Sequence, residues 1–360
     1  MTLRLTLAAL VLFLAATPAW ADDAADCEKG PGDVAIAACT RIIESGNWHG
    51  SNLAAAYFNR GNARHDKGDL AGSLTDYDRA ITLNPKYIEA YNNRAIIKTG
   101  RGDFKGAMAD YDRAIALDPK RAALYFHRGI AKGSQDDING AIADYDHAIA
   151  IDPNYIKAYA NRAITKEHRG DFKGAMADYD RAIALDPKRA LLYFDRGAAR
   201  QHKNNLDGAI ADYTRAIALD PKDADTYNNR GSAKNLKGDF GGAISDYTQA
   251  IALDPKRALL YFGRGIAKQD KGDLDGAIAD DDHAIALDPE YTDAYANRAV
   301  IKAGRGDFKG AIADDDRAIA LNPKLAVVYK NRGLAKKTKG DLRGATADYH
   351  TYHILTHSQQ

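Results

Sequence analysis

Two columns of charged residues recur along this chain, each with a spacing of 34 residues. Nine arginines form the first column, a second basic residue follows each of them four positions later, and nine aspartates form the other column. The arginines could bind a polyanion, or they could pair with the aspartates inside the protein. We favour internal ion pairs between neighbouring helices, because a ligand would not require the same residue in every copy. The arginines are Arg60, Arg94, Arg128, Arg162, Arg196, Arg230, Arg264, Arg298 and Arg332, and the aspartates are Asp76, Asp110, Asp144, Asp178, Asp212, Asp246, Asp280, Asp314 and Asp348.

Two further aspartates stand where the other copies have tyrosine. Asp281 and Asp315 each complete a run of three acids, whereas Tyr111 holds the same position in an earlier copy. A carboxylate at a packing site costs stability unless it is solvated or paired. The two residues could therefore mark a site for a cation or a basic partner, or they could record drift that water accommodates. In either case we expect the seventh and eighth copies to open first.

Three histidines near the C-terminus have the spacing of metal ligands. His350, His353 and His357 would share one face of a helix and could hold a metal, although a solvated chain end has the same pattern. The sequence contains no nucleophile elbow, phosphate loop, HExxH motif or pair of catalytic acids. We therefore expect a protein that is not an enzyme, with no cofactor and no metal.

The period that carries these residues is set by eight prolines from Pro85 to Pro323, which stand 34 residues apart. A fixed period of this length is typical of a solenoid, in which each unit buries its apolar face only by stacking on its neighbours. Small residues such as Gly61 and Ala107 recur with the same period, which indicates places where two helices approach closely. The architecture therefore favours surface recognition over a closed catalytic pocket.

One unit of the repeat, residues 88–121, reads as two helices. The pattern predicts helices over 88–101 and 104–117, with Gly102 in a left-handed conformation and Asp103 as the N-cap of the second helix. At the end of the unit, Asp118-Pro119 is expected to supply the N-cap and first turn of the next helix.

Across the repeats the first helix carries the pattern Tyr-x-Asn-Arg-Gly and the second carries Ala-Ile-x-Asp-Tyr, each in exact or closely similar form. In these motifs the chain resembles the tetratricopeptide repeat proteins. The resemblance covers residues 54–360, as eight full repeats over 54–325 and a terminal hairpin over 326–360. It implies an all-α fold, a right-handed superhelical solenoid of about nine 34-residue helix-turn-helix repeats. In this family the first helices line a concave groove that binds peptides or extended protein segments.

The phenylalanines beyond residue 21 fall into two series, each with a spacing of 68 residues, so the array alternates two kinds of repeat. The resemblance places one series in the groove, beside a column rich in asparagine whose amides can both donate to and accept from a bound backbone. We expect a groove for an extended, moderately apolar polypeptide, although the alternation could instead record only the duplication of repeat pairs. The candidate groove residues are Phe58, Asn59, Asn92, Asn93, Phe126, His127, Asn161, Phe194, Asn228, Asn229, Phe262 and Asn297.

The N-terminal segment has the pattern of a secretory signal peptide over residues 1–21. Arg4 precedes an apolar run too short to span a bilayer, and Ala19-Trp20-Ala21 suits cleavage. We expect export to a bacterial periplasm or beyond the cell, with an uncleaved anchor as the alternative. Residues 22–53 would form an N-terminal capping segment in which 33–45 resemble an isolated second helix. Its two cysteines, Cys27 and Cys39, would form a disulfide.

The charge balance restricts the class of partner. The chain has 50 basic and 49 acidic side chains, and the predicted signal peptide contains one arginine and no acid, so the mature chain is neutral. Neutrality argues against a nucleic-acid partner and against membrane insertion or an acidic-membrane footprint, although it permits self-association. We therefore predict a non-catalytic scaffold that binds a protein or peptide. The alternatives are an accessory protein that binds a glycan or cell wall and a self-associating structural protein.

Overall fold

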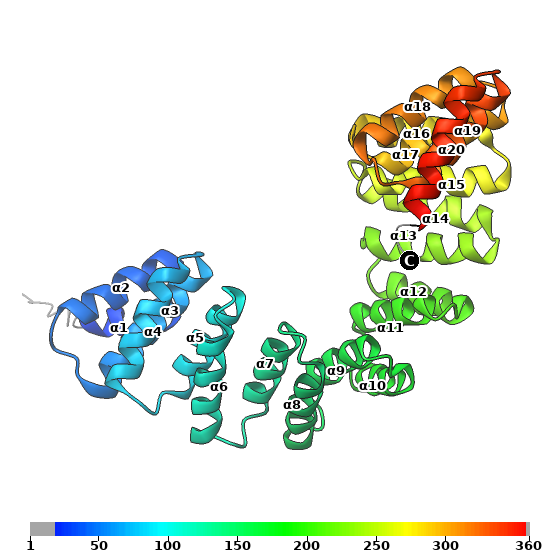
Figure 1. Cartoon of the computed structure of the whole chain (residues 1–360). Helices are drawn as coiled ribbons and strands as arrows, with labels where there is room; N and C mark the ends of the chain where they lie inside the picture. The colour runs from blue at the N-terminus through cyan, green and yellow to red at the C-terminus, as the bar shows by residue number, and fades with distance from the viewer. Residues whose placement is uncertain (1–18, 358–360) are drawn as a thin grey trace, which may run out of the picture. The chain divides into compact units, whose positions relative to one another are not determined.

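The computed structural model describes residues 19–357, and every regular element in that range is an α-helix (Figure 1). A short pair, α1 (Ala19–Lys29) and α2 (Gly32–Glu44), precedes nine helical hairpins, which we number as repeats one to nine. The first helices of the repeats are α3 (Gly50–Asp66), α5 (Ile88–Gly100), α7 (Ala122–Gly133), α9 (Ile156–His168), α11 (Ala190–His202), α13 (Ala224–Lys237), α15 (Ala258–Lys271), α17 (Thr292–Gly304) and α19 (Ala326–Thr338). The second helices are α4 (Leu70–Leu83), α6 (Phe104–Leu117), α8 (Ile138–Ile151), α10 (Phe172–Leu185), α12 (Leu206–Leu219), α14 (Phe240–Leu253), α16 (Leu274–Leu287), α18 (Phe308–Leu321) and α20 (Leu342–His357).

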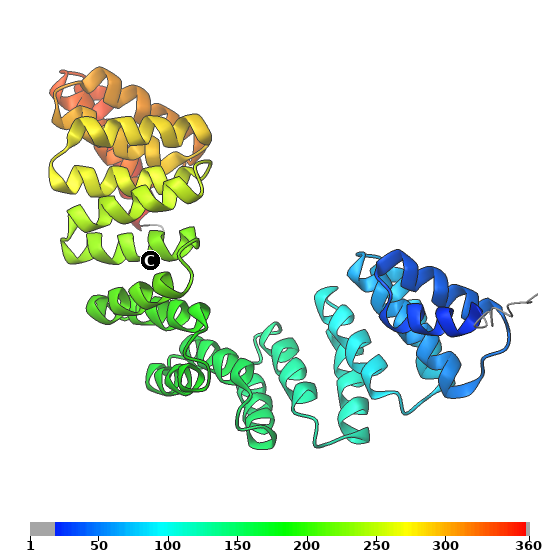
Figure 2. The ribbon, with the colours of Figure 1, turned by 180° about the vertical axis from the view of Figure 1, so that it is seen from behind.

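The chain divides into two compact units, with the boundary between Asp178 and Tyr179 inside α10. Within each unit every helix packs on the next one along the chain, and the first helices of consecutive repeats also touch from α5 to α9 and from α11 to α19 (Figures 1 and 2). This nearest-neighbour packing is the arrangement of a helical solenoid, which confirms the predicted all-α repeat fold.

The turn inside each hairpin has the geometry that its sequence predicts. Gly102 has a φ of 78°, and Asp136 and Asn204, which replace glycine in two repeats, have φ values of 61° and 58°. The Asp103 carboxylate then accepts a hydrogen bond of 3.0 Å from the backbone N–H of Gly106 at the start of α6. Asparagine and aspartate tolerate the left-handed conformation better than other side chains, which explains why they replace glycine here.

The turn between repeats differs from the prediction. Helix α6 ends before Asp118, and α7 begins only at Ala122, so neither Asp118 nor Pro119 belongs to the following helix. The Asp118 carboxylate instead accepts a hydrogen bond of 3.2 Å from the backbone N–H of Lys120. An aspartate that bonds two residues ahead forms a tight turn by itself. The prediction that Asp118 caps the next helix is therefore wrong.

Small residues and a tyrosine form the contact inside each hairpin. A side-chain carbon at Gly61 would lie 2.8 Å from Cε1 of Tyr77, which is closer than such atoms approach. In the second repeat Tyr111 is 1% exposed and packs against Ala95, Ala107 and Ala131. The close approach that the recurring small residues predict is confirmed.

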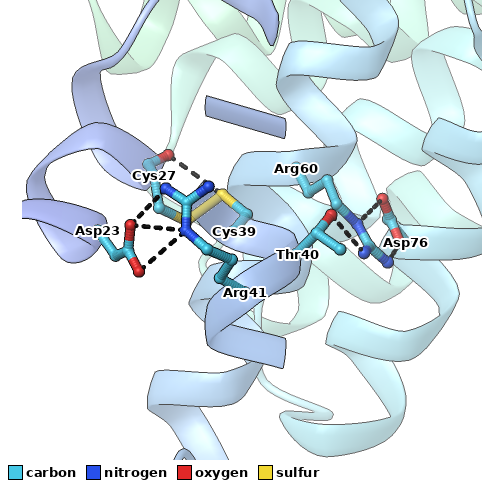
Figure 3. The surroundings of a disulfide bond; sticks show 7 residues. All are labelled: Asp23, Cys27, Cys39, Thr40, Arg41, Arg60 and Asp76. Carbon is cyan, nitrogen blue, oxygen red and sulfur yellow. Dashed lines mark hydrogen bonds and ion pairs between the residues drawn. A yellow bond between two sulfur atoms is a disulfide. The ribbon is translucent and has the colours of Figure 1, made fainter. Parts of the chain in front are cut away.

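A disulfide and an ion pair join the two helices of the N-terminal pair, and Arg60 of α3 donates a hydrogen bond to Thr40 of α2 (Figure 3). Cys27 of α1 and Cys39 of α2 form the predicted disulfide, and Arg41 pairs with Asp23 beside it. Helix α2 is not isolated, as the sequence suggested, because α1 packs on it. The array opens with α3 at Gly50, inside the predicted capping segment. Most of the predicted signal peptide lies outside the described residues, which begin at position 19.

Candidate functional site

The charged columns form one arrangement that Arg128 illustrates. Its Nε and Nη2 atoms donate to the two oxygens of Asp144 at 2.9 and 2.6 Å, and Lys132 Nζ lies 2.8 Å from Asp144 Oδ2. The guanidinium also lies over the Tyr125 ring, 5.6 Å from its centroid. Its Nη1 atom donates to Asp112 of the preceding repeat at 2.7 Å. The hydrogen bonds that Arg128 donates to Asp144 are the main cause that raises its pKa, and its bond to Asp112 adds to this effect.

The same bidentate pair joins the two helices of all nine repeats, so the predicted ion pairs are confirmed. Each aspartate of the second column is buried, and it receives a second basic side chain from one turn further along the first helix. The pairs are Arg60–Asp76, Arg94–Asp110, Arg128–Asp144, Arg162–Asp178, Arg196–Asp212, Arg230–Asp246, Arg264–Asp280, Arg298–Asp314 and Arg332–Asp348.

The contact from each arginine to the preceding helical pair was missed by sequence reasoning. Six arginines reach an aspartate there, whereas Arg230 and Arg264 reach Thr214 and Thr248, and Arg60 reaches Thr40 of α2. The sequence signal for this contact was the second aspartate of the recurring Asp-Tyr-Asp triplet, such as Asp112 after Tyr111. Because the arginines are paired on both sides, they hold repeats together and do not form a free basic track. The six acidic partners are Asp78, Asp112, Asp146, Asp180, Asp282 and Asp316.

The phenylalanines of the candidate groove pack inside the array. Phe126 is only 5% exposed, because it lies between Tyr145 and Tyr155 with ring centroids 6.0 and 5.1 Å away. Phe126 therefore presents almost no surface to a ligand, which corrects its placement in a binding groove. Phe58 and Phe262 are half-buried and pack on the equivalent tyrosines that precede the next repeat, at 4.8 and 5.2 Å.

These contacts give the 68-residue alternation a structural reason. A repeat with phenylalanine in its first helix is followed by tyrosine before the next helix at Tyr87, Tyr155 and Tyr291, and by Asp223 in the remaining case. Phe194 has no such tyrosine, and a cavity of about 250 Å³ lies beside it, lined also by Asp223. In three of these four repeats, therefore, the phenylalanine of the first helix packs on the tyrosine that precedes the next repeat.

The candidate asparagines and His127 form hydrogen bonds with one another and with other groups of the array. Asn93 Nδ2 donates to Asn62 of the preceding repeat at 3.0 Å, and His127 Nδ1 lies 2.8 Å from Asn92 Oδ1. Burial, with a smaller contribution from Lys157, lowers the pKa of His127. In the same way Asn228 donates to Asn229 at 3.0 Å and Asn297 to Asp281 at 2.9 Å, while Asn161 donates to the Lys157 carbonyl at 2.9 Å. Asn59 is half-buried.

Three pockets recur at equivalent positions, between the first helices of consecutive repeats and above a residue of the second helix. We call them the inter-repeat pockets and identify them by that floor residue: Tyr77, Tyr213 or Asp315. Their volumes are about 340, 410 and 290 Å³. Of the predicted groove residues, Asn93 lines the first and Asn229 the second, and Asn331 holds the same position in the third.

Aliphatic side chains on the rims of these pockets were missed by sequence reasoning. Ile96 is 38% exposed at the Tyr77 pocket, and Val300 and Leu334 are 42% and 60% exposed at the Asp315 pocket. The equivalent residues Ile130 and Ile164 are also exposed. The signal was an isoleucine, valine or leucine two positions after six of the nine arginines, on the side of the helix opposite its buried residues. A row of exposed apolar residues on one helix face indicates a binding surface.

The floor residues differ in chemistry. Tyr77 and Tyr213 donate their hydroxyls to Asn62 at 2.7 Å and Gln201 at 3.0 Å. Asp315 is 1% exposed, and its Oδ1 atom has no hydrogen-bond partner. Burial raises its pKa to about 7, and burial does the same for Asp281 in the seventh repeat.

The remaining sequence candidates form no cluster. His353 and His357 lie one turn apart on α20, with ring centroids 5.9 Å apart. Within residues 19–357 no group of three potential ligands could hold a metal ion. None of the helices described has the length and apolar composition that crossing a membrane requires.

Comparisons with known proteins agree on one kind of repeat. Family models described as tetratricopeptide repeat match residues 122–155, 169–228 and 264–326, and one described as TPR repeat matches 61–99, 97–136 and 232–272. No curated protein gives a significant match.

Several solved structures are similar. The MamA protein is 26% identical over 47% of this chain and 93% of its own, with a TM-score of 0.43. The C-terminal part of a TPR repeat-containing protein from Cytophaga hutchinsonii is 17% identical over 66% and 98%, with a TM-score of 0.57. A tetratricopeptide repeat protein from Parabacteroides merdae is 19% identical over 69% and 96%, with a TM-score of 0.51.

Proposed function

Because the chain belongs to the tetratricopeptide repeat family, we propose that it is a non-catalytic scaffold that binds an extended polypeptide across the first helices of its repeats. The observation that carries this proposal is the recurrence of the inter-repeat pockets at equivalent positions, each between two first helices. A polypeptide is a ligand whose side chains also recur at regular intervals, so it can occupy several such pockets at once.

The chemistry of this face suits a moderately apolar segment. Exposed aliphatic residues such as Ile96, Ile130 and Ile164 offer apolar contact, and asparagines such as Asn93 lie beside them. The arginines are occupied by internal ion pairs, so the face has no free basic column for a polyanion. We further propose that the protein acts after export, on the basis of the signal-like residues 1–21.

The proposal is tested by charge insertion on the binding face, with controls of equal exposure elsewhere. The triple variant Ile96→Glu/Ile130→Glu/Ile164→Glu is compared with Ile151→Glu/Leu287→Glu, whose residues are 36% and 40% exposed on second helices. Each form captures partners from an envelope extract, and the Kd of an identified partner is then measured by calorimetry.

We expect the triple variant to lose capture and the control variant to retain it. Equal capture by both variants would remove the first-helix face as the binding surface. Digestion of the extract before capture identifies the ligand class: protease should abolish binding and glycosidase should not. The reverse result would replace the polypeptide with a glycan.

A further inference from the structure

The inter-repeat pocket above Asp315 combines apolar walls with one buried carboxylate. Helices α17, α18 and α19 enclose about 290 Å³, and Val300, Phe308 and Leu334 contribute apolar surface. Its polar lining consists of Asp315 at the floor with Asn331 and Thr338. The equivalent space above Tyr111 in the second repeat is occupied by the tyrosine ring, which is 1% exposed.

The Asp315 carboxylate lacks a partner in a place where a charge needs one. It is 1% exposed, and its Oδ1 atom accepts no hydrogen bond from any part of the chain that the structure describes. A buried carboxylate is stable as an anion only when a cation or several donors compensate it. A ligand that brings a positive charge or a hydrogen-bond donor to the floor of the pocket would therefore stabilise the Asp315 carboxylate.

The charged groups around Asp315 are committed to other partners. Arg332 of α19 holds Asp348 of α20 and Asp316 of α18, at 2.5 and 2.6 Å. Asp314 is held by Arg298 and Lys302 of α17. Of these groups Arg332 lowers the pKa of Asp315, whereas Asp314, Asp316 and Asp348 raise it. No neighbouring cation is therefore left to compensate this carboxylate.

We propose that the Asp315 pocket binds an alkylammonium group, that is, a primary ammonium at the end of an unbranched apolar chain. The carboxylate would accept a hydrogen bond from the ammonium, while Val300, Leu334 and Phe308 would contact the alkyl chain. Such a group comes either from a lysine side chain of a bound polypeptide or from a free aliphatic amine. The lysine source rests on the proposed scaffold function, and the free-amine source does not.

The other floor residues make this pocket different from its counterparts. The hydroxyls of Tyr77 and Tyr213 already have protein acceptors, so those floors require no cation. Asp281 is equally buried and its Oδ1 atom also lacks a partner, but its Oδ2 atom accepts a hydrogen bond of 2.9 Å from Asn297. Asp281 is therefore the matched control for a carboxylate at the same position in a repeat.

The test is a titration of the purified chain, labelled at its isoleucine, leucine and valine methyl groups, with n-butylammonium at pH 8. We expect saturable shifts at Val300 and Leu334, and no saturable shift at Ile96 and Leu236, which line tyrosine-floored pockets. The neutral analogue n-butanol should bind at least about tenfold more weakly, because a charge-assisted hydrogen bond is lost. Absence of saturable shifts, or equal binding of n-butanol, would overturn the proposal.

Three variants separate charge from shape. Asp315→Asn keeps the cavity and should weaken n-butylammonium binding at least about tenfold, whereas Asp281→Asn should leave it unchanged. Asp315→Tyr replaces the carboxylate with a ring at the floor of the pocket and should abolish binding, and its methyl spectrum reports whether the repeat is folded. Unchanged affinity in Asp315→Asn would contradict recognition by the carboxylate. Lowering the pH from 8 to about 5.5 protonates Asp315 and should weaken binding in the unmodified chain and in Asp281→Asn, but not in Asp315→Asn.

A last arm distinguishes the two sources. Nα-acetyl-lysine N-methylamide presents the lysine side chain on a backbone, so binding of this probe at Val300 and Leu334 assigns the pocket to lysine. Binding of n-butylammonium alone assigns it to free amines. If the first-helix variants keep their partner while n-butylammonium still binds, the proposed scaffold surface is wrong and the pocket proposal stands.

Discussion

The second and eighth repeats form a natural pair, because their second helices differ at only two positions. Helix α6 reads FKGAMADYDRAIAL and α18 reads FKGAIADDDRAIAL, so Tyr111 becomes Asp315. The ion pairs are the same in both: Arg94 Nε lies 2.8 Å from Asp110 Oδ2, and Arg298 Nε lies 2.9 Å from Asp314 Oδ2. The helices and their ion pairs are therefore set independently of the aromatic ring, whose loss changes only the space that it filled.

Burial acts on both floor residues with opposite consequences. It raises the pKa of Tyr111 to about 12, so the phenol remains neutral at physiological pH, and it raises the pKa of Asp315 to about 7. The same environment thus stabilises the tyrosine form of the repeat over a wide pH range and leaves the aspartate form close to its titration point. One substitution converts a packing position into a pH-dependent one.

The largest effect on stability is expected when Tyr111 of the second repeat is replaced by the aspartate that the eighth repeat has at this position. Tyr111→Asp removes a ring that packs on Ala95, Ala107 and Ala131 and buries a carboxylate in its place. We expect a loss of about 3–5 kcal/mol in the free energy of unfolding at pH 8, measured by urea denaturation. Tyr111→Phe, which keeps the packed ring and adds no carboxylate, is the control. A loss below about 1 kcal/mol would show that the array relaxes around the missing ring.

The reverse exchange should stabilise the eighth repeat. Asp315→Tyr faces Ala299, as Tyr111 faces Ala95, so the ring has a precedent in the same surroundings. We expect a gain of about 1.5–3 kcal/mol in the free energy of unfolding at pH 8. Asp281→Tyr provides a second case, opposite Gly265. A loss of stability in both variants would mean that these repeats have closed around the smaller side chain.

The pH dependence of stability should separate the aspartate repeats from the rest. Since the folded-state pKa values of Asp281 and Asp315 are about 7 and an unfolded aspartate titrates near ~3.9, the folded chain binds more protons between these values. The stabilisation by the neutral carboxyls is present below about pH 4 and is lost as the pH rises to 7. Compared with Asp281→Asn/Asp315→Asn, the unmodified chain should therefore weaken from pH 5 to pH 8. A constant difference between the two would contradict these pKa shifts.

The smallest effect concerns local opening. With buried carboxylates that lack full hydrogen bonding, the seventh and eighth repeats should open before the fifth and sixth in the same compact unit. Hydrogen exchange at pH 8 should show faster exchange for buried amides of α16 and α18 than of α12 and α14. Equal protection of all four helices would remove this difference between the two kinds of repeat.

Much of the fold could be predicted because each signal was repeated many times. The helix bounds of 104–117, the left-handed Gly102 and the Arg–Asp pair inside each hairpin all follow from local spacing. The contact from Arg128 to Asp112 did not follow, because periodicity shows that columns recur but not which repeat a side chain reaches. Phe126 shows the same limit, because its recurrence could be read from the sequence but its burial depends on Tyr155, which precedes the next repeat.

The candidate site was predictable only in part, for a related reason. Asn93 and Asn229 line inter-repeat pockets as members of a predicted column. Ile96 and Val300 were not recognised, since exposure on the first helix depends on how consecutive repeats pack. The pocket above Asp315 could not be predicted, because helix α19 of the next repeat forms one of its walls.

The contact that each arginine makes with the preceding helical pair also determines where the array would bend when it is pulled. Within the second compact unit, Arg298 and Arg332 form ion pairs with aspartates of the preceding repeat. Arg230 and Arg264 instead donate hydrogen bonds to the neutral hydroxyls of Thr214 and Thr248. At low ionic strength the contacts between repeats that rest on Thr214 and Thr248 are the weaker ones, so a pulling force should bend the unit there first. Because salt weakens the partly exposed carboxylate contacts and spares the hydroxyls, added salt should even out the stiffness and spread the bending along the unit.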